Sequence, residues 1–264
     1  MTAEIALEPR RGMGKLSGMR RFIAPFVLAF ALVTPSAIGQ ITFEFDFVDV
    51  NNGSGVGFDD AALGATRRTA LAAGASLLAD VFTTAAARTV KITVNASTAV
   101  DNGTLASAGA STFTSSVYNK GLPMGVIQSG SHSGQSEHGS MTWNFHETWD
   151  YDDSIASGAF DFKGVTMHEL SHALGFSSYI TSSGSGPFTN TAAYNYFDQF
   201  LTDSSGNKLV DSSGVYQGGD ILKTSEGNSS DVYFSGANAM AANGGERVHM
   251  YSPTEYNSGS SLSH

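Results

Sequence analysis

The chain has 264 residues, enough for one domain with a sizeable core, and its formal net charge is −10. Because an acidic chain lacks the clustered cations that neutralise phosphates, we expect no nucleic-acid partner. Cysteine is absent, which excludes disulfide frameworks, thiolate nucleophiles and cysteine-based zinc sites. Any metal must therefore be held by histidine and carboxylate side chains.

Residues 1–39 are predicted to be a secretory signal peptide. Arginine and lysine residues precede an apolar run at 22–33, and small residues at Ala37 and Gly39 follow it. The apolar run contains a proline and falls short of the roughly 20 residues of a membrane-spanning helix. We therefore expect cleavage after Gly39, a secreted, extracellular protein, and no stable insertion in a membrane after cleavage.

The mature region, residues 40–264, is predicted to be one α+β domain. Alternation of apolar and polar residues indicates strands, and apolar residues at three-to-four spacing indicate helices. The predicted strands are residues 41–47, 90–94 and 141–145, and the predicted helices are residues 59–87 and 162–176.

The rest of the mature region shows weaker patterns. Residues 95–140 are rich in Ser, Gly, Thr and Asn and are predicted to be mostly loop. The turn residues 203–207 lie between two short apolar runs, which predicts a hairpin within 196–210. The remainder of the C-terminal part is predicted to be irregular.

The second predicted helix carries His168-Glu169-Leu170-Ser171-His172. Two histidines at i and i+4 lie on one helix face about one turn apart, so both imidazoles can reach a single Zn²⁺. The glutamate beside the first histidine can then act on the water that the metal activates. A catalytic zinc usually has three protein ligands, so a third ligand must come from elsewhere in the chain.

The run from His168 to Ser177, His-Glu-Leu-Ser-His-Ala-Leu-Gly-Phe-Ser, resembles leishmanolysin-type metalloproteases and related secreted bacterial proteins of the metzincin class. In that family a long insertion separates the glycine, here Gly175, from a third histidine in a Ser-His segment. The resemblance implies that His264 is the third zinc ligand. It also implies a metzincin-like zincin domain with a small mixed sheet, two main helices and an irregular C-terminal part. The resemblance covers residues 59–87, 141–145, the motif helix and 231–264, and only the motif helix is highly specific.

Two features depart from the metzincin pattern. Position 178 is Ser, where the compact motif has a zinc-ligating His or Asp. The Met-turn that should follow the third histidine is missing, so we expect the catalytic domain to be C-terminally truncated. His249 and Asp198 remain alternatives to His264 as the third ligand.

These features predict a zinc-dependent metalloendopeptidase that acts on a peptide or protein substrate. Zinc held by His168, His172 and His264 would polarise the scissile carbonyl, with Glu169 as the general base. One alternative is a non-catalytic extracellular matrix or adhesion protein that retains a structural or degenerate zinc site. Another is a zinc hydrolase acting on a non-peptide bond.

Two further segments contain residues of interest. Residues 141–146 are assigned to peptide binding by strand addition, because metzincin-like proteases bind substrate along the strand before the motif helix. Core packing of Trp143 would explain that segment nearly as well. His132 and His138 could bind a second metal, but a polar loop is the favoured interpretation.

Overall fold

The computed structural model describes residues 39–97, 103–115, 117–184, 194–219, 231–253, 255–257 and 260–264. The predicted signal peptide, apart from Gly39, lies outside the described residues. Within the described part of the chain, no helix is long and apolar enough to cross a membrane.

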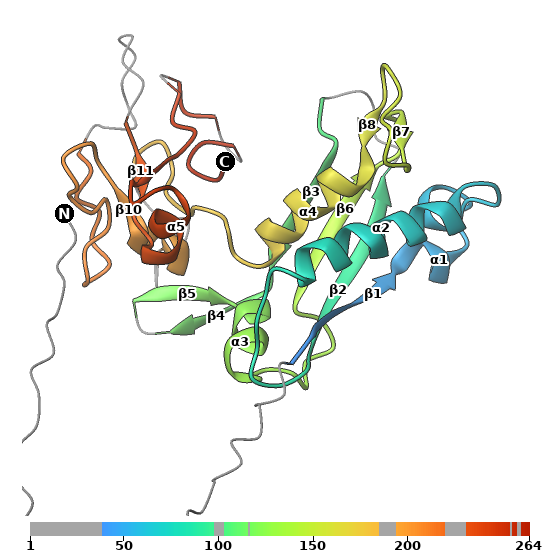
Figure 1. The fold of residues 1–264 in the computed structure, drawn as a ribbon, viewed down its shortest axis with the longest axis horizontal. Coiled ribbons are helices and arrows are strands. Elements are labelled where there is room, and N and C mark those ends of the chain that lie inside the picture. The colour runs from blue at the N-terminus through green and yellow to red at the C-terminus, as the bar shows by residue number, and fades with distance from the viewer. Residues whose placement is uncertain are drawn as a thin grey trace, which may run out of the picture. The chain divides into compact units, whose positions relative to one another are not determined.

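A four-stranded mixed sheet supports the larger of two cores (Figure 1). The strand order is β1 (Ile41–Phe47), β2 (Arg88–Ser97), β6 (Gly139–Asn144) and β3 (Ala106–Ala110). The first three strands run parallel, and β3 pairs with β6 in the antiparallel direction. The three strands predicted from the alternating pattern are therefore confirmed.

Two helices pack together beside the sheet, as Figure 1 shows for α2 (Gly64–Ala79) and α4 (Phe162–Ala173). Helix α2 also contacts β1, and α4 contacts β3 and β6. The helices approach closely at Gly74, where an added Cβ would lie 2.8 Å from the Cβ of Thr166. Both predicted helices are confirmed, with shorter boundaries than expected.

The predicted helix 59–87 is shortened at both ends. At its start, Gly57–Asp59 forms a separate 3-10 turn, η1, which follows a short helix α1 (Val48–Asn52). At its end, Thr84 exchanges hydrogen bonds with Gly39, which aligns the chain for β2 instead of continuing the helix. Ala-rich composition alone therefore overestimates the length of the helix, because tertiary pairing overrides helix propensity.

The prediction that residues 95–140 are mostly loop is wrong. This region contains β3, β4 (Thr112–Ser115), β5 (Tyr118–Gly121) and α3 (Leu122–Ser129). Strand β3 has the sequence Ala-Ser-Ala-Gly-Ala, which lacks large apolar side chains. Its position is set by backbone pairing with β6, and composition does not reveal such pairing.

The assignment of residues 141–146 to peptide binding is also wrong. Strand β6 lies inside the sheet and pairs with β2 on one side and β3 on the other, so it offers no free edge. Trp143 is fully buried and stacks on Phe162 with ring centroids 4.0 Å apart. The Trp143 side chain therefore belongs to the core. The edge strands of the sheet are β1 and β3, and β3 is the one that contacts α4.

The C-terminal part builds a second, smaller core around Leu201, Val232, Met250 and Leu262. Its elements are β9 (Tyr194–Asn195), η2 (Tyr196–Phe200), β10 (Leu201–Thr202), β11 (Tyr233–Phe234), α5 (Ala237–Ala242) and β12 (Val248–His249). A further short pair, β7 (Trp149–Asp150) and β8 (Phe160–Asp161), precedes α4. The fold is thus α+β, as predicted.

The predicted hairpin within 196–210 is confirmed at its turn. Thr202 and Lys208 form an antiparallel bridge, and Asp203 N–H donates to the carbonyl of Asn207. The residues before the turn form the 3-10 helix η2 instead of a longer strand, because Asn195 and Asp198 cap that helix in a reciprocal capping box.

Candidate metal centre

Helix α4 presents the His-Glu motif from a firmly packed base. The Asp161 side chain caps the helix by accepting a hydrogen bond from Lys163 N–H at 3.0 Å. Phe162, Leu170 and Ala173 are fully buried on the core side. His168 is exposed and His172 is half-buried. The apolar face therefore fixes the helix, and the opposite face carries the two histidines.

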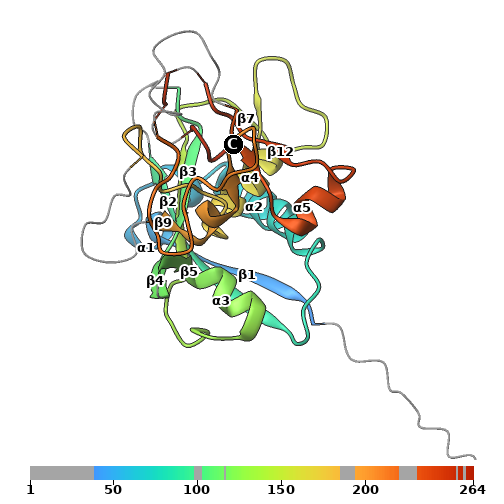
Figure 2. The ribbon, with the colours of Figure 1, turned by 90° about the vertical axis from the view of Figure 1, so that its left-hand side faces the viewer.

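His264 joins these two residues to form what we call the histidine cluster. The Nε2 atom of His168 lies 3.1 Å from Nε2 of His172 and 3.1 Å from Nε2 of His264. One ligand atom from each of the three residues lies within 4.8 Å of the others. Figure 2 shows the C-terminal end beside α4. The spacing fits one small cation, because tetrahedral zinc holds nitrogen ligands roughly 3.3 Å apart.

Hydrogen bonds orient two of the imidazoles toward the shared point. Nδ1 of His172 donates to the carbonyl of Phe176 at 2.7 Å, and Nδ1 of His264 donates to the carbonyl of Ser260 at 2.8 Å. A ring that donates through Nδ1 in its neutral form carries a lone pair on Nε2. Carbonyl partners of this kind are typical of metal-ligating histidines. The lone pairs therefore converge where a metal would sit.

Burial lowers the pKa values of His168 and His172, and for His168 the neighbouring imidazoles lower it further. The hydrogen bond to Phe176 acts in the opposite direction on His172. Both shifts favour neutral imidazole, which is the form that binds a metal.

The segment that carries His264 is held by backbone pairing. Tyr251 N–H donates to the carbonyl of His264 at 2.7 Å, and Leu262 N–H donates to the carbonyl of Tyr251 at 2.8 Å. Leu262 is fully buried with φ +66°, and Ser263 Oγ accepts from Ser178 N–H at 3.0 Å. These contacts place the histidine opposite α4 despite its position in an irregular segment.

The turn after α4 depends on Gly175, which has φ +103°. Its N–H donates to the carbonyl of His172, and Phe176 N–H donates to the carbonyl of Ser171. A left-handed residue closing a helix in this way is most easily a glycine. The turn brings the Phe176 carbonyl back to the His172 ring, so the same glycine that ends the helix also helps to orient a candidate ligand.

Glu169 lies between the two helix histidines and is 5% exposed. Its Oε2 atom is buried and has no hydrogen-bond partner among the described residues. Burial raises the pKa of this carboxyl to about 7. An unpaired buried carboxylate is costly in a purely structural position, so its retention beside the cluster favours a chemical role.

The cluster opens into a cleft of about 780 Å³. One wall is formed by residues 103–108, which include the start of β3, and another by α4. Within the described residues β3 pairs only with β6, so its second edge is unpaired, and Ala106, Ser107 and Ala108 of this strand line the cleft. The cleft therefore places a free strand edge beside the histidine cluster and Glu169.

The alternative third ligands lie elsewhere. His249 is half-exposed, and its Nε2 lies 3.7 Å from Asp231. Asp198 is fully buried and accepts hydrogen bonds from Tyr179 N–H at 3.0 Å and Asn195 N–H at 2.8 Å. Neither belongs to the histidine cluster, which is the only group of potential metal ligands found in the described part of the chain.

His138 has a structural role. It is fully buried, its Nδ1 accepts from Lys91 N–H at 2.9 Å, and its Nε2 donates to the carbonyl of His132 at 3.1 Å. With both ring nitrogens engaged, His138 has no lone pair to offer. The favoured interpretation was a polar loop, but His138 is buried and held by the backbone instead of lying exposed in such a loop.

Sequence reasoning missed β3, the Ser178–Ser263 contact and the carbonyl partners of the imidazoles. Only Gly175 gave a signal, because a glycine directly after a helix indicates a left-handed turn. No protein-family model, no curated protein and no solved structure matches this chain. The assignment of the metal centre therefore depends on its own geometry.

Proposed function

We propose that this protein is a secreted zinc-dependent metalloendopeptidase with a metzincin-like zincin domain. The observation that carries the proposal is the convergence of three imidazole Nε2 atoms beside the buried, unpaired carboxyl of Glu169. His168, His172 and His264 would hold the metal. When bound, zinc would supply Lewis acidity that polarises a carbonyl group.

The proton transfers fall to Glu169. Its carboxyl borders the cleft together with the three histidines, so it can take a proton from the attacking water and pass it to the leaving amine. Phe176 and Ser260 keep His172 and His264 in the tautomer that presents Nε2. The enclosed position of Glu169 on α4 limits the motion of the base relative to the ligands.

A peptide substrate is favoured by the free edge of β3. The backbone N–H and C=O groups of an extended peptide can pair with such an edge, which aligns the scissile bond with the cleft. Ala106, Ser107 and Ala108 line the cleft with small side chains, which leave room for the substrate. The antiparallel edge strand beside the motif helix, with α2 packed behind that helix, also supports a metzincin-like domain.

The proposal is tested by zinc content and peptide cleavage in matched variants. Glu169→Gln should retain one zinc per chain and lose turnover by several orders of magnitude, because only the base is removed. His264→Ala should lose most of the zinc. His249→Ala is the matched control, since it removes an exposed histidine outside the cluster, and it should retain both properties.

Each alternative has its own outcome. Full zinc content in every variant of the cluster would contradict the metal site itself. Stoichiometric zinc without cleavage of any peptide would contradict the protease and favour the non-catalytic extracellular protein. Secretion is tested separately by N-terminal sequencing of the exported protein, which should begin at Gln40.

A further inference from the structure

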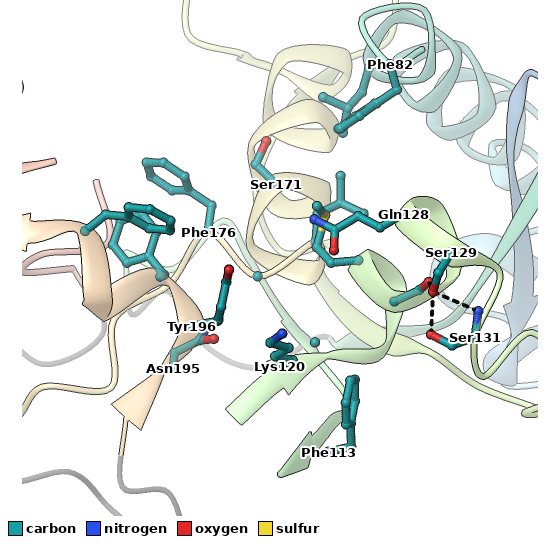
Figure 3. Close-up of a pocket in the computed structure, with 18 of the residues that line it drawn as sticks. Phe82, Phe113, Lys120, Gln128, Ser129, Ser131, Ser171, Phe176, Asn195 and Tyr196 are labelled. Atoms are coloured by element: carbon teal, nitrogen blue, oxygen red, sulfur yellow. Dashed lines mark hydrogen bonds between the residues drawn. The ribbon is translucent and has the colours of Figure 1, made fainter. Parts of the chain in front are cut away.

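A second cavity of about 660 Å³ lies beside the C-terminal end of α4, and Figure 3 shows its walls. The walls come from the end of α2, α3, α4, the β4–β5 hairpin, β9, η2 and β11. Six phenylalanines from the described part of the chain line it: Phe82, Phe113, Phe176, Phe197, Phe200 and Phe234. The volume and the aromatic lining match those of sites that bind ligands with large apolar groups.

Among the described residues of this lining, Lys120 is the only charged one. Its Nζ lies 4.5 Å from the ring centroid of Tyr196, and it forms no ion pair within the described chain. The chain has 24 acidic residues against 14 basic ones, yet none of the acidic residues that the structure describes lines this cavity. An unpaired ammonium group among aromatic rings attracts a carboxylate more strongly than it would in open water.

The aromatic cavity is adjacent to the metal centre. Ser171 and Phe176 line it, and the same two residues line the smaller cavity of about 450 Å³ that contains the histidine cluster. Ser171 lies between the two helix histidines in sequence, and Figure 3 shows it on α4 with Phe176 nearby. A ligand at the metal centre can therefore extend past these residues into the aromatic cavity.

We propose that the aromatic cavity binds a segment of the substrate polypeptide in which large apolar side chains flank an aspartate or glutamate. The carboxylate would pair with Lys120, and the apolar side chains would pack on the phenylalanines. This inference depends on the proposed function only in that the segment belongs to the peptide cut at the metal centre. A polypeptide is favoured over a small apolar molecule because Phe176 and Tyr196, 40% and 39% exposed, leave the cavity open.

Binding can be measured without any cleavage. The full chain is kept in excess chelator, and fluorescence anisotropy reports the affinity for labelled pentapeptides with aspartate, asparagine or lysine between two phenylalanines. Aspartate should bind about tenfold more tightly than asparagine, which corresponds to about 1.4 kcal/mol. The lysine peptide should bind more weakly still, and alanine in place of both phenylalanines should abolish binding.

Protein variants assign the effect to this cavity. Lys120→Glu should reverse the preference between the aspartate and lysine peptides, and Lys120→Met should remove it while retaining the aliphatic packing on Tyr196. Lys208→Glu is the matched control, because it makes the same charge change at an exposed lysine outside the cavity. It should leave the preference unchanged.

Three results would overturn the inference. They are no binding of the aspartate peptide, equal affinity for the three peptides, or the same change in peptide preference in Lys120→Glu and Lys208→Glu. The proposed protease is judged separately from cleavage by the zinc-loaded protein. Charge-selective binding without cleavage would contradict the protease and retain the aromatic cavity. Cleavage without charge-selective binding would contradict the proposed role of the aromatic cavity and retain the protease.

Discussion

Asp198 provides a quantitative test of the distinction between a structural carboxyl and a metal ligand. The side chain is fully buried, and its Oδ2 accepts two backbone hydrogen bonds, from Tyr179 and Asn195. Its Oδ1 is buried without a hydrogen-bond partner in the described structure. Burial raises the pKa of Asp198 from 3.8 to about 7, although the hydrogen bonds it accepts act in the opposite direction.

The sign of the pH dependence follows from this raised pKa. Between pH 3.8 and about 7 the folded state holds a proton that the unfolded state has lost, so unfolding becomes easier as the pH rises. The interval corresponds to a free energy of about 4 kcal/mol, at about 1.4 kcal/mol for each tenfold change in proton concentration. This contribution is fully present below pH 3.8 and lost above pH 7.

The Asp198→Asn variant isolates that contribution. Asparagine keeps an oxygen for the two backbone N–H groups but cannot ionise. Its stability relative to the wild type should therefore rise by up to about 4 kcal/mol between pH 4 and pH 8. Urea unfolding of both proteins across this range gives the difference directly, and other titrating groups cancel. Zinc content should stay unchanged, since this carboxyl lies outside the histidine cluster.

Asp211→Asn serves as the matched control. Backbone hydrogen bonds, first that from Val215, lower the pKa of this partly exposed carboxyl, so it stays ionised from pH 5 to pH 8. The difference in stability between this variant and the wild type should be flat from pH 5 to pH 8. A flat difference for Asp198→Asn as well would refute the reasoning about burial. Loss of zinc in Asp198→Asn would instead restore that residue as a ligand.

Three further changes have expected outcomes. Gly74→Ala should lower the unfolding free energy by about 1–3 kcal/mol, because the added Cβ would press on Thr166. Gly109→Ala is the control, since its added Cβ meets open space, and urea unfolding measures the stability of both variants. Gly175→Ala should cost about 1–2 kcal/mol through its positive φ and also weaken zinc binding, as measured by competition with a chromogenic chelator. Chelator should abolish peptide cleavage and lower the melting temperature, and zinc at 100 times its dissociation constant should restore about 2.7 kcal/mol of stability. Equal melting temperatures with and without zinc would contradict binding to the folded state.

The sequence predicted the elements that depend on local periodicity. Alternating side chains mark β1, because one of its faces lies against the core and the other faces outward. The proximity of His168 and His172 was equally predictable, since one helical turn alone brings those two side chains together. In both cases the relevant neighbours are a few residues apart, so the pattern is complete within a short window.

The position of His264 could not be derived in the same way. Its place in the cluster depends on pairing with Tyr251 and on the contact between Ser263 and Ser178, and neither leaves a periodic pattern. Resemblance to a known family suggested His264 as the third ligand, and only the structure gives its distance from the other two histidines. Strand β3 was missed for a related reason: its small side chains carry no apolar alternation, and its partner β6 comes about 30 residues later in the chain.

The histidine cluster joins the two cores of the protein. His168 and His172 project from α4, whose buried residues belong to the sheet core, whereas His264 follows Leu262, which belongs to the C-terminal core. The rings of His172 and His264 both donate through Nδ1, and two Nε2 lone pairs directed to one point repel each other unless a cation lies between them. Metal binding would therefore strengthen the contact between the cores, and its loss would weaken that contact. The cleft has walls from both cores and contains the three histidines, so the same metal that supports the proposed chemistry would also fix the shape of the cleft.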